Sequence, residues 1–162
     1  MLVPLLQSQV LAPDEGPTFW MLDLPGCAKA TAEQTGGVFS LIEAVCPVGY
    51  ATPLHIHYLE DEAVYVLEGR LTFFLGGRQE TARAGSYVYQ PRGIAHGFRV
   101  HGEAPARILA LSVPAGTEQP CLLDSGAASL AGWAPLELET LADLAARHKI
   151  EVLGPLPALD PS

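Results

Sequence analysis

Short apolar runs separated by glycine and proline constrain the fold of this chain more than any other feature of its sequence. Glycine and proline supply 30 of the 162 residues, well above the roughly 12% of an average protein. The runs between them are about five to eight residues long and rich in β-branched and aromatic side chains, as expected of β-strands. We predict strands over 18–24, 29–33, 38–46, 53–58, 62–67, 70–75, 86–90, 95–100, 107–113 and 150–153.

The first nine predicted strands follow one another with no helix between them. This order favours an antiparallel all-β sandwich or barrel. The dipeptides Glu68-Gly69 and Gly76-Gly77 each lie between two predicted strands. Because glycine supports the tight turns of β-hairpins, both dipeptides predict a hairpin.

The pattern divides the chain into three parts. Residues 1–16 are expected to form an N-terminal arm, residues 17–118 a β-barrel, and residues 119–162 a C-terminal extension. Within the extension, apolar residues recur at spacings of three and four over 136–148. This periodicity predicts one amphipathic helix.

The charge of the chain excludes several classes of function. Nine Lys and Arg residues against 18 Asp and Glu residues give a net charge of -9, and no basic patch is present. Nucleic-acid binding and attachment to an anionic membrane both depend on such a patch. No apolar stretch approaches the ~20 residues of a membrane span, and the N-terminus lacks the basic segment of a signal peptide.

Cysteine content and strand composition suggest where the protein acts and with what partners. Three widely spaced cysteines without a CxxC pair do not form a disulfide framework, so we expect a cytoplasmic protein. The segments 64–67 and 108–111 are apolar at consecutive positions, which predicts strands covered on both faces. We therefore expect a homodimer that forms through a sheet face or an exchanged N-terminal arm, together with a small-molecule substrate.

One group of polar residues points to chemistry. His55 and His57 are two residues apart on a predicted strand, so both imidazoles project from the same face. A short turn over 58–61 would let a paired strand bring Glu62 back beside them, and His96 lies on a later strand. Buried polar groups need partners, and imidazole with carboxylate is a ligand set that divalent transition metals prefer.

The spacing of these residues resembles the cupin family. Gly49, His55, His57, Glu62 and Gly69 match the first cupin motif without a departure, and Gly85, Pro91, Gly93 and His96 match most of the second. Val100 stands where the family often has asparagine. The resemblance implies a double-stranded β-helix, the cupin jelly-roll barrel, with a hairpin at Pro91 and Gly93 that delivers His96 from the opposite sheet. It also implies one divalent metal (Fe, Mn, Ni, Co, Cu or Zn) bound by His55, His57, Glu62 and His96.

More narrowly, the chain resembles the single-domain bacterial cupins grouped with quercetin 2,3-dioxygenase. The likeness rests on the segments 16–20, 35–37, 55–62, 91–96, 144–147 and 151–155. It implies a dioxygenase that cleaves a flavonol or similar enolic aromatic, with Glu62 as catalytic proton acceptor. Two alternatives stay open at this point: a metal-dependent isomerase or lyase of a small acid or sugar phosphate, and a non-enzymatic cupin that binds a small molecule.

Overall fold

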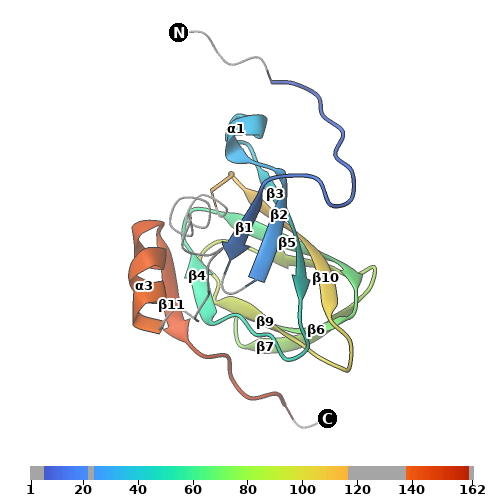
Figure 1. Cartoon of the computed structure of the whole chain (residues 1–162). Helices are drawn as coiled ribbons and strands as arrows, with labels where there is room; N and C mark the ends of the chain where they lie inside the picture. The colour runs from blue at the N-terminus through green and yellow to red at the C-terminus, as the bar shows by residue number, and fades with distance from the viewer. Residues whose placement is uncertain (1–5, 22–23, 117–137, 161–162) are drawn as a thin grey trace.

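The fold is built from two antiparallel sheets, as seen in a computed structural model that describes residues 6–21, 24–116 and 138–160 (Figure 1). The six-stranded sheet has the order β1 (Thr18–Met21), β2 (Leu24–Ala30), β3 (Ser40–Cys46), β10 (Ala106–Val113), β5 (Asp61–Glu68) and β8 (Tyr87–Gln90). The five-stranded sheet has the order β11 (Ile150–Gly154), β4 (Leu54–His57), β9 (His96–Val100), β6 (Arg70–Leu75) and β7 (Arg78–Arg83). The predicted all-β jelly-roll is thereby confirmed.

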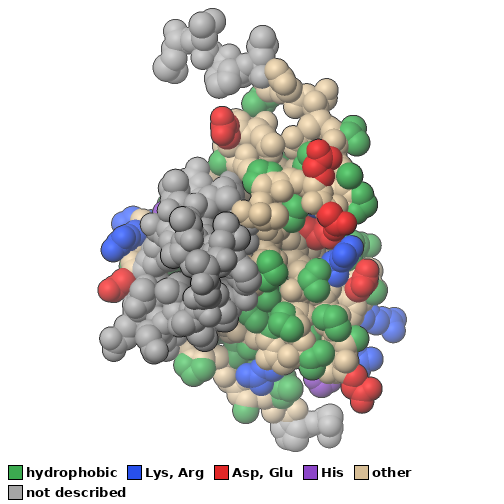
Figure 2. Space-filling model, in the orientation of Figure 1, with side chains coloured by type: hydrophobic (Ala, Val, Ile, Leu, Met, Phe, Trp, Pro, Cys, Tyr) green, Lys and Arg blue, Asp and Glu red, His purple; other side chains and the backbone are tan. Residues whose placement is uncertain are grey.

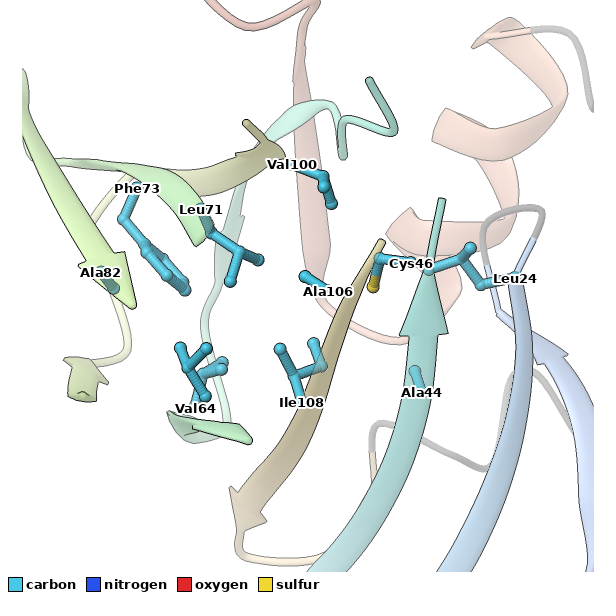
Figure 3. Close-up of a cluster of buried hydrophobic side chains, with 11 residues drawn as sticks. Leu24, Ala44, Cys46, Val64, Leu71, Phe73, Ala82, Val100, Ala106 and Ile108 are labelled. Atoms are coloured by element: carbon cyan, nitrogen blue, oxygen red, sulfur yellow. The ribbon is translucent and has the colours of Figure 1, made fainter. Parts of the chain in front are cut away.

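The inner faces of the two sheets form one hydrophobic core. Val64 and Ile108 from the six-stranded sheet lie toward Leu71 and Phe73 from the five-stranded sheet (Figure 3). Phe73 is fully buried, and burial of such a side chain contributes about 1.5–3 kcal/mol. Strand β3 shows the alternation that produces this arrangement, since every second side chain is buried along Ser40–Cys46.

The predicted strand over 29–33 is wrong. Strand β2 ends at Ala30 and a single-turn helix, α1 (Ala32–Thr35), follows. Thr31 forms a capping box with Gln34, in which each side chain binds the other residue's backbone N–H. Gly36 then ends the helix in the left-handed conformation at φ 65°. Reciprocal capping of this kind stabilises a helix start, and here it overrides the strand pattern.

Strand β7 is absent from the predicted set. Its sequence, Arg78–Arg83, is almost entirely polar, and only Ala82 is buried. The strand lies at an edge of the five-stranded sheet and pairs with β6 alone. An edge strand with one face in solvent needs little apolar periodicity, so the hydrophobic pattern did not reveal it.

One of the two predicted hairpins is confirmed. Gly76 and Gly77 join β6 to β7, and both adopt positive φ angles, as a two-residue hairpin turn requires. The hairpin predicted at Glu68-Gly69 is wrong, because β5 and β6 belong to different sheets. Gly69 still has no room for a side chain: a Cβ there would lie 2.7 Å from the Ala106 Cα.

The C-terminal region adds one helix and one strand. Helix α3 (Leu138–Arg147) confirms the helix predicted over 136–148. Strand β11 pairs with β4, the strand that carries His55 and His57, so it supports the sheet that carries the candidate site. The boundaries of the three predicted parts stay a prediction. None of the helices in the described ranges is long and apolar enough to cross a membrane.

Candidate metal centre

Four side chains converge at one end of the space between the sheets. His55 and His57 come from β4, His96 from β9 and Glu62 from β5. One ligand atom of each residue lies within 4.8 Å of a ligand atom of every other. The structure thus brings together the four residues expected from the sequence, while their role as metal ligands stays a prediction.

The route by which these residues meet differs from the predicted one. Strands β4 and β9 are neighbours, with His55 directly opposite His96, so the three histidines share the five-stranded sheet. Glu62 lies across the barrel in the six-stranded sheet. The turn after His57 and the turn after Gln90 therefore each cross between sheets. Pairing of Glu62 with the histidine strand and delivery of His96 from the opposite sheet were both wrong.

Hydrogen bonds fix the orientation of each imidazole ring. Nδ1 of His55 lies 2.9 Å from the carbonyl oxygen of Pro53, and Nδ1 of His96 lies 2.8 Å from that of Ile94. A carbonyl oxygen only accepts, so each Nδ1 carries a proton and Nε2 is the ring atom left to bind a metal; at His96 a metal would replace the hydrogen bond between Nε2 and Glu62. Both rings therefore present Nε2 to the centre of the cluster, as metal-binding histidines do when a backbone acceptor holds the other nitrogen.

His57 is held by a carboxylate instead of a carbonyl. Its Nδ1 lies 3.3 Å from Oε2 of Glu60, and both side chains are buried. The second oxygen of Glu60 lies against Gly116, where an added Cβ would come within 2.9 Å of Oε1. Gly116 therefore leaves the space that Glu60 occupies. Sequence reasoning missed Glu60, although it stands in the acidic run Glu60-Asp61-Glu62.

Glu62 links the histidines to the six-stranded sheet. Its Oε2 lies 3.0 Å from Nε2 of His96 and 3.4 Å from Nε2 of His57. Its Oε1 accepts a hydrogen bond from the Ser112 hydroxyl at 3.5 Å. Two ligand atoms at ~2.1 Å from one metal are ~3.0–3.4 Å apart when their directions differ by 90–110°. The donor set and its spacing therefore fit a divalent transition metal.

The local charges and burial set the protonation states of the cluster, and these states suit the binding of a cation. Burial opposes ionisation of Glu62, but the nearby charge of His57 and the hydrogen bond with His96 outweigh it and lower the pKa to about 2. Burial, reinforced by His96, lowers the pKa of His55 to about 4. His57 also experiences burial, yet Glu62 and Glu60 raise its pKa above 6.5. At neutral pH Glu62 is therefore charged and His55 neutral.

An ion pair at the rim joins the two motif segments. The guanidinium of Arg92 binds both carboxylate oxygens of Asp61, at 3.1 and 2.9 Å, and its backbone N–H donates to the same group. The hydrogen bonds from Arg92 lower the pKa of Asp61 to about 2. Asp61 directly precedes Glu62, so this pair fixes the segment that positions the carboxylate.

Comparison with known proteins agrees with this geometry. Residues 42–113, which include all four site residues, match the family described as the cupin domain. An uncharacterized protein of Methanocaldococcus jannaschii is 39% identical over 75 residues, or 46% of this chain and 60% of the relative. Quercetin 2,3-dioxygenase of Bacillus subtilis is 32% identical over 71 residues, or 44% of this chain and 21% of that enzyme. The chain spans less than two thirds of either relative.

Solved structures agree on the fold. A protein of Thermotoga maritima described as a "predicted oxalate decarboxylase" superimposes with a TM-score of 0.61 at 19% identity, over 65% of this chain and 99% of that one. A likeness at this level of identity concerns the fold alone. The chain therefore carries a cupin domain over residues 42–113, on the fold that this structure shares.

Proposed function

We propose that this chain is a metal-dependent cupin oxidoreductase, a dioxygenase that acts on a flavonol or a similar enolic aromatic molecule. The observation that carries the proposal is the cluster of three inward-facing imidazoles and one carboxylate. The likeness to the quercetin 2,3-dioxygenase of Bacillus subtilis over the segment that contains this cluster supports it.

A divalent metal held by His55, His57, Glu62 and His96 would supply positive charge where a substrate oxyanion develops. The protein supplies the proton acceptor: Glu62 is ionised and lies at the centre of the cluster, so a carboxylate oxygen can take the proton of an enolic hydroxyl. Ser112 holds Oε1 of Glu62, which leaves Oε2 to face the histidines. Burial of His57 and His96 excludes bulk water from this side of the site.

The charges near the site favour this proposal over an isomerase or lyase of a sugar phosphate or small acid. Besides the metal, a phosphate or carboxylate substrate needs Arg or Lys side chains to bind its negative charge. The second motif contributes Arg92, and its guanidinium is already engaged by both oxygens of Asp61. The histidine cluster itself carries one carboxylate from Glu62. A substrate that arrives neutral and loses a proton at Glu62 suits this arrangement better.

Oxygen consumption tests the proposal. Protein loaded separately with Fe, Mn, Ni, Co or Cu is mixed with a panel of flavonols and catechols, and oxygen uptake is recorded. We expect uptake with at least one pairing. Glu62→Gln should abolish turnover more completely than metal binding, whereas the exposed His101→Ala variant should retain both. No uptake with any pairing, together with oxygen-independent turnover of a sugar phosphate, would establish the isomerase alternative; ligand binding without any turnover would establish a binding protein.

A further inference from the structure

A row of buried polar side chains crosses the inner face of the six-stranded sheet beside the metal centre. Ser112 on β10 lies directly opposite Ser40 on β3 and opposite Glu62 on β5, and Glu62 lies opposite Gln90 on β8. Four neighbouring strands thus each contribute one polar residue at the same level. Adjacent strands are ~4.8 Å apart, so Gln90 is ~5 Å and Ser40 ~10 Å from Glu62 along the row.

The next row of the same face is entirely apolar. Ala110 lies opposite Ile42 and Val64, and Val64 lies opposite Val88. This row forms part of the hydrophobic core or packs against it, with Ile42 also buried. The change from apolar to polar occurs within one step along all four strands, at the level of Glu62. The polar row therefore belongs to the site and not to the core.

Two side-chain oxygen atoms of the polar row have no hydrogen-bond partner among the described residues. Ser40 is fully buried and Gln90 is 4% exposed, yet neither Oγ of Ser40 nor Oε1 of Gln90 forms a hydrogen bond with any described residue. Buried polar atoms are nearly always hydrogen-bonded, so each of these two oxygens has a hydrogen-bonding position that a bound molecule can fill. Ser40 and Gln90 lie on either side of the Glu62–Ser112 pair.

We infer that Gln90 and Ser40 are substrate-recognition residues, which form hydrogen bonds with hydroxyl groups of a neutral, polyhydroxylated aromatic substrate. This inference rests on the proposed function, because it places the reacting oxygen of that substrate beside Glu62. The amide oxygen of Gln90 accepts a hydrogen bond, so it selects a substrate group with an O–H to donate. The Ser40 hydroxyl both donates and accepts, and suits a second hydroxyl further along the molecule.

The row also determines which substrates it rejects. A site built to hydrogen-bond a hydroxyl discriminates against an analogue that lacks it, because the buried protein group is then left unpaired. The row contains no Lys or Arg, so it provides no counter-charge for a phosphate. Gln90 is thus a specificity-determining residue that selects substrates with a hydroxyl group next to the reacting centre.

Stability measurements on the metal-free protein test the first part of this inference. Thr52→Val is the matched control, since Thr52 is buried and its Oγ1 accepts the Phe98 N–H at 3.0 Å. We expect this control to lower Tm by about 3 °C. Gln90→Leu and Ser40→Ala should leave Tm unchanged or raise it, since each removes a buried oxygen atom that forms no hydrogen bond with any described residue. A loss as large as that of the control would mean that Gln90 and Ser40 serve the fold, and would overturn the inference.

Binding to the Zn²⁺-loaded protein tests the second part. Calorimetry compares quercetin with 3-hydroxyflavone, which keeps the enolic hydroxyl but lacks the other hydroxyl groups. We expect wild-type protein to prefer quercetin, and Gln90→Leu to weaken quercetin binding about tenfold while 3-hydroxyflavone binding changes less than twofold. The Zn²⁺ affinity of the variant should equal that of the wild type. A preference that survives in Gln90→Leu would overturn the inference.

The same experiment separates failure of this inference from failure of the proposed function. If the wild-type protein binds neither flavonol, the flavonol proposal fails, and catechol and pyrogallol, which differ by one hydroxyl group, replace the flavonols. A preference for pyrogallol that Gln90→Leu abolishes would then support the recognition role on its own. Absence of any preference, or of any binding, would overturn it.

Discussion

The two sheets of the barrel contribute different chemistry to the same site. The five-stranded sheet supplies three imidazoles, each with Nδ1 held by a carbonyl or carboxylate oxygen. The six-stranded sheet supplies Glu62 and the polar row beside it, in which Oγ of Ser40 and Oε1 of Gln90 form no hydrogen bond with any described residue. The five-stranded sheet, whose imidazoles are already oriented by hydrogen bonds, is suited to hold a metal. The six-stranded sheet, which carries side-chain oxygens without a partner in the described ranges, is suited to receive a substrate.

This comparison shows why the site depends on the packed barrel. His55 and His96 are paired across adjacent strands, so local sheet structure is enough to bring them together. Glu62 reaches them only because the hydrophobic core, with Phe73 on one side and Val64 on the other, holds the two sheets face to face (Figure 3). We therefore expect histidine variants in the five-stranded sheet to weaken metal binding, and variants of Ser40 and Gln90 in the six-stranded sheet to weaken substrate binding alone.

The largest expected effect comes from removal of an imidazole. His96→Ala should lower Zn²⁺ affinity by more than about 100-fold, because loss of a direct ligand exceeds the 10–100-fold cost of losing a group that merely orients one. Competition calorimetry measures the affinity. His101→Ala, which alters an exposed histidine just beyond β9, is the control and should bind Zn²⁺ as the wild type does. Equal Zn²⁺ affinity for both variants would show that His96 is not a metal ligand.

The two histidines of β4 should have opposite effects on the pH dependence of stability without metal. His55 has a pKa of about 4 in the folded protein against 6.5 when unfolded, so protons favour the unfolded chain and stability falls as pH drops from 6.5 to 4, by roughly 1–3 kcal/mol. His57 has a raised pKa, so its contribution is present below pH 6.5 and is lost as pH rises through the folded value.

Urea denaturation at several pH values checks this contrast. His55→Gln should flatten the fall in unfolding free energy between pH 6.5 and pH 4, and His57→Gln should remove a loss of stability that occurs as pH rises above 6.5. Parallel pH profiles for both variants would show that the two imidazoles do not titrate in opposite directions.

A smaller effect is expected from the carboxylate behind His57. Glu60→Ala should weaken Zn²⁺ binding about tenfold, since Glu60 orients the ring through Nδ1. Glu60→Gln keeps an acceptor oxygen and should restore most of the affinity. Gly116→Ala leaves Glu60 intact but places a Cβ within 2.9 Å of its carboxylate, and should weaken binding in the same direction. Unchanged affinity in both Glu60→Ala and Gly116→Ala would contradict this role.

The smallest effect on the site is expected from the outer face of the six-stranded sheet. Tyr65, Tyr87 and Tyr89 are 46–66% exposed there, and Figure 2 shows hydrophobic side chains in the region of β5 and β10. The homodimer expected from the sequence stays a prediction, and this face is its proposed contact. Tyr65→Lys should shift sedimentation from dimer toward monomer while Zn²⁺ affinity changes less than twofold. A wild-type monomer at high micromolar concentration would refute it.

Much of the fold and the four site residues were predictable because they depend on local spacing. The alternation of a strand places His55 and His57 on one face, and glycine and proline mark where strands end. Helix α1 could also have been predicted, since Thr31 and Gln34 form a capping box just before Gly36. The strand-like sequence on either side led instead to the prediction of a strand. Strand β7 left no such signal, because only Ala82 among its residues is buried.

The tertiary structure alone decided which sheet each group comes from and which residues stand beside it. Sequence spacing placed Glu62 beside the histidines, where the structure has it, but the predicted route was wrong, because the short turn after His57 crosses to the other sheet. The row of Ser40, Ser112, Glu62 and Gln90 draws on strands between positions 40 and 112 of the chain and is aligned only by the pairing register of those four strands. Strand periodicity determines the face on which a side chain lies, whereas its neighbours are set by hydrogen bonds to distant strands.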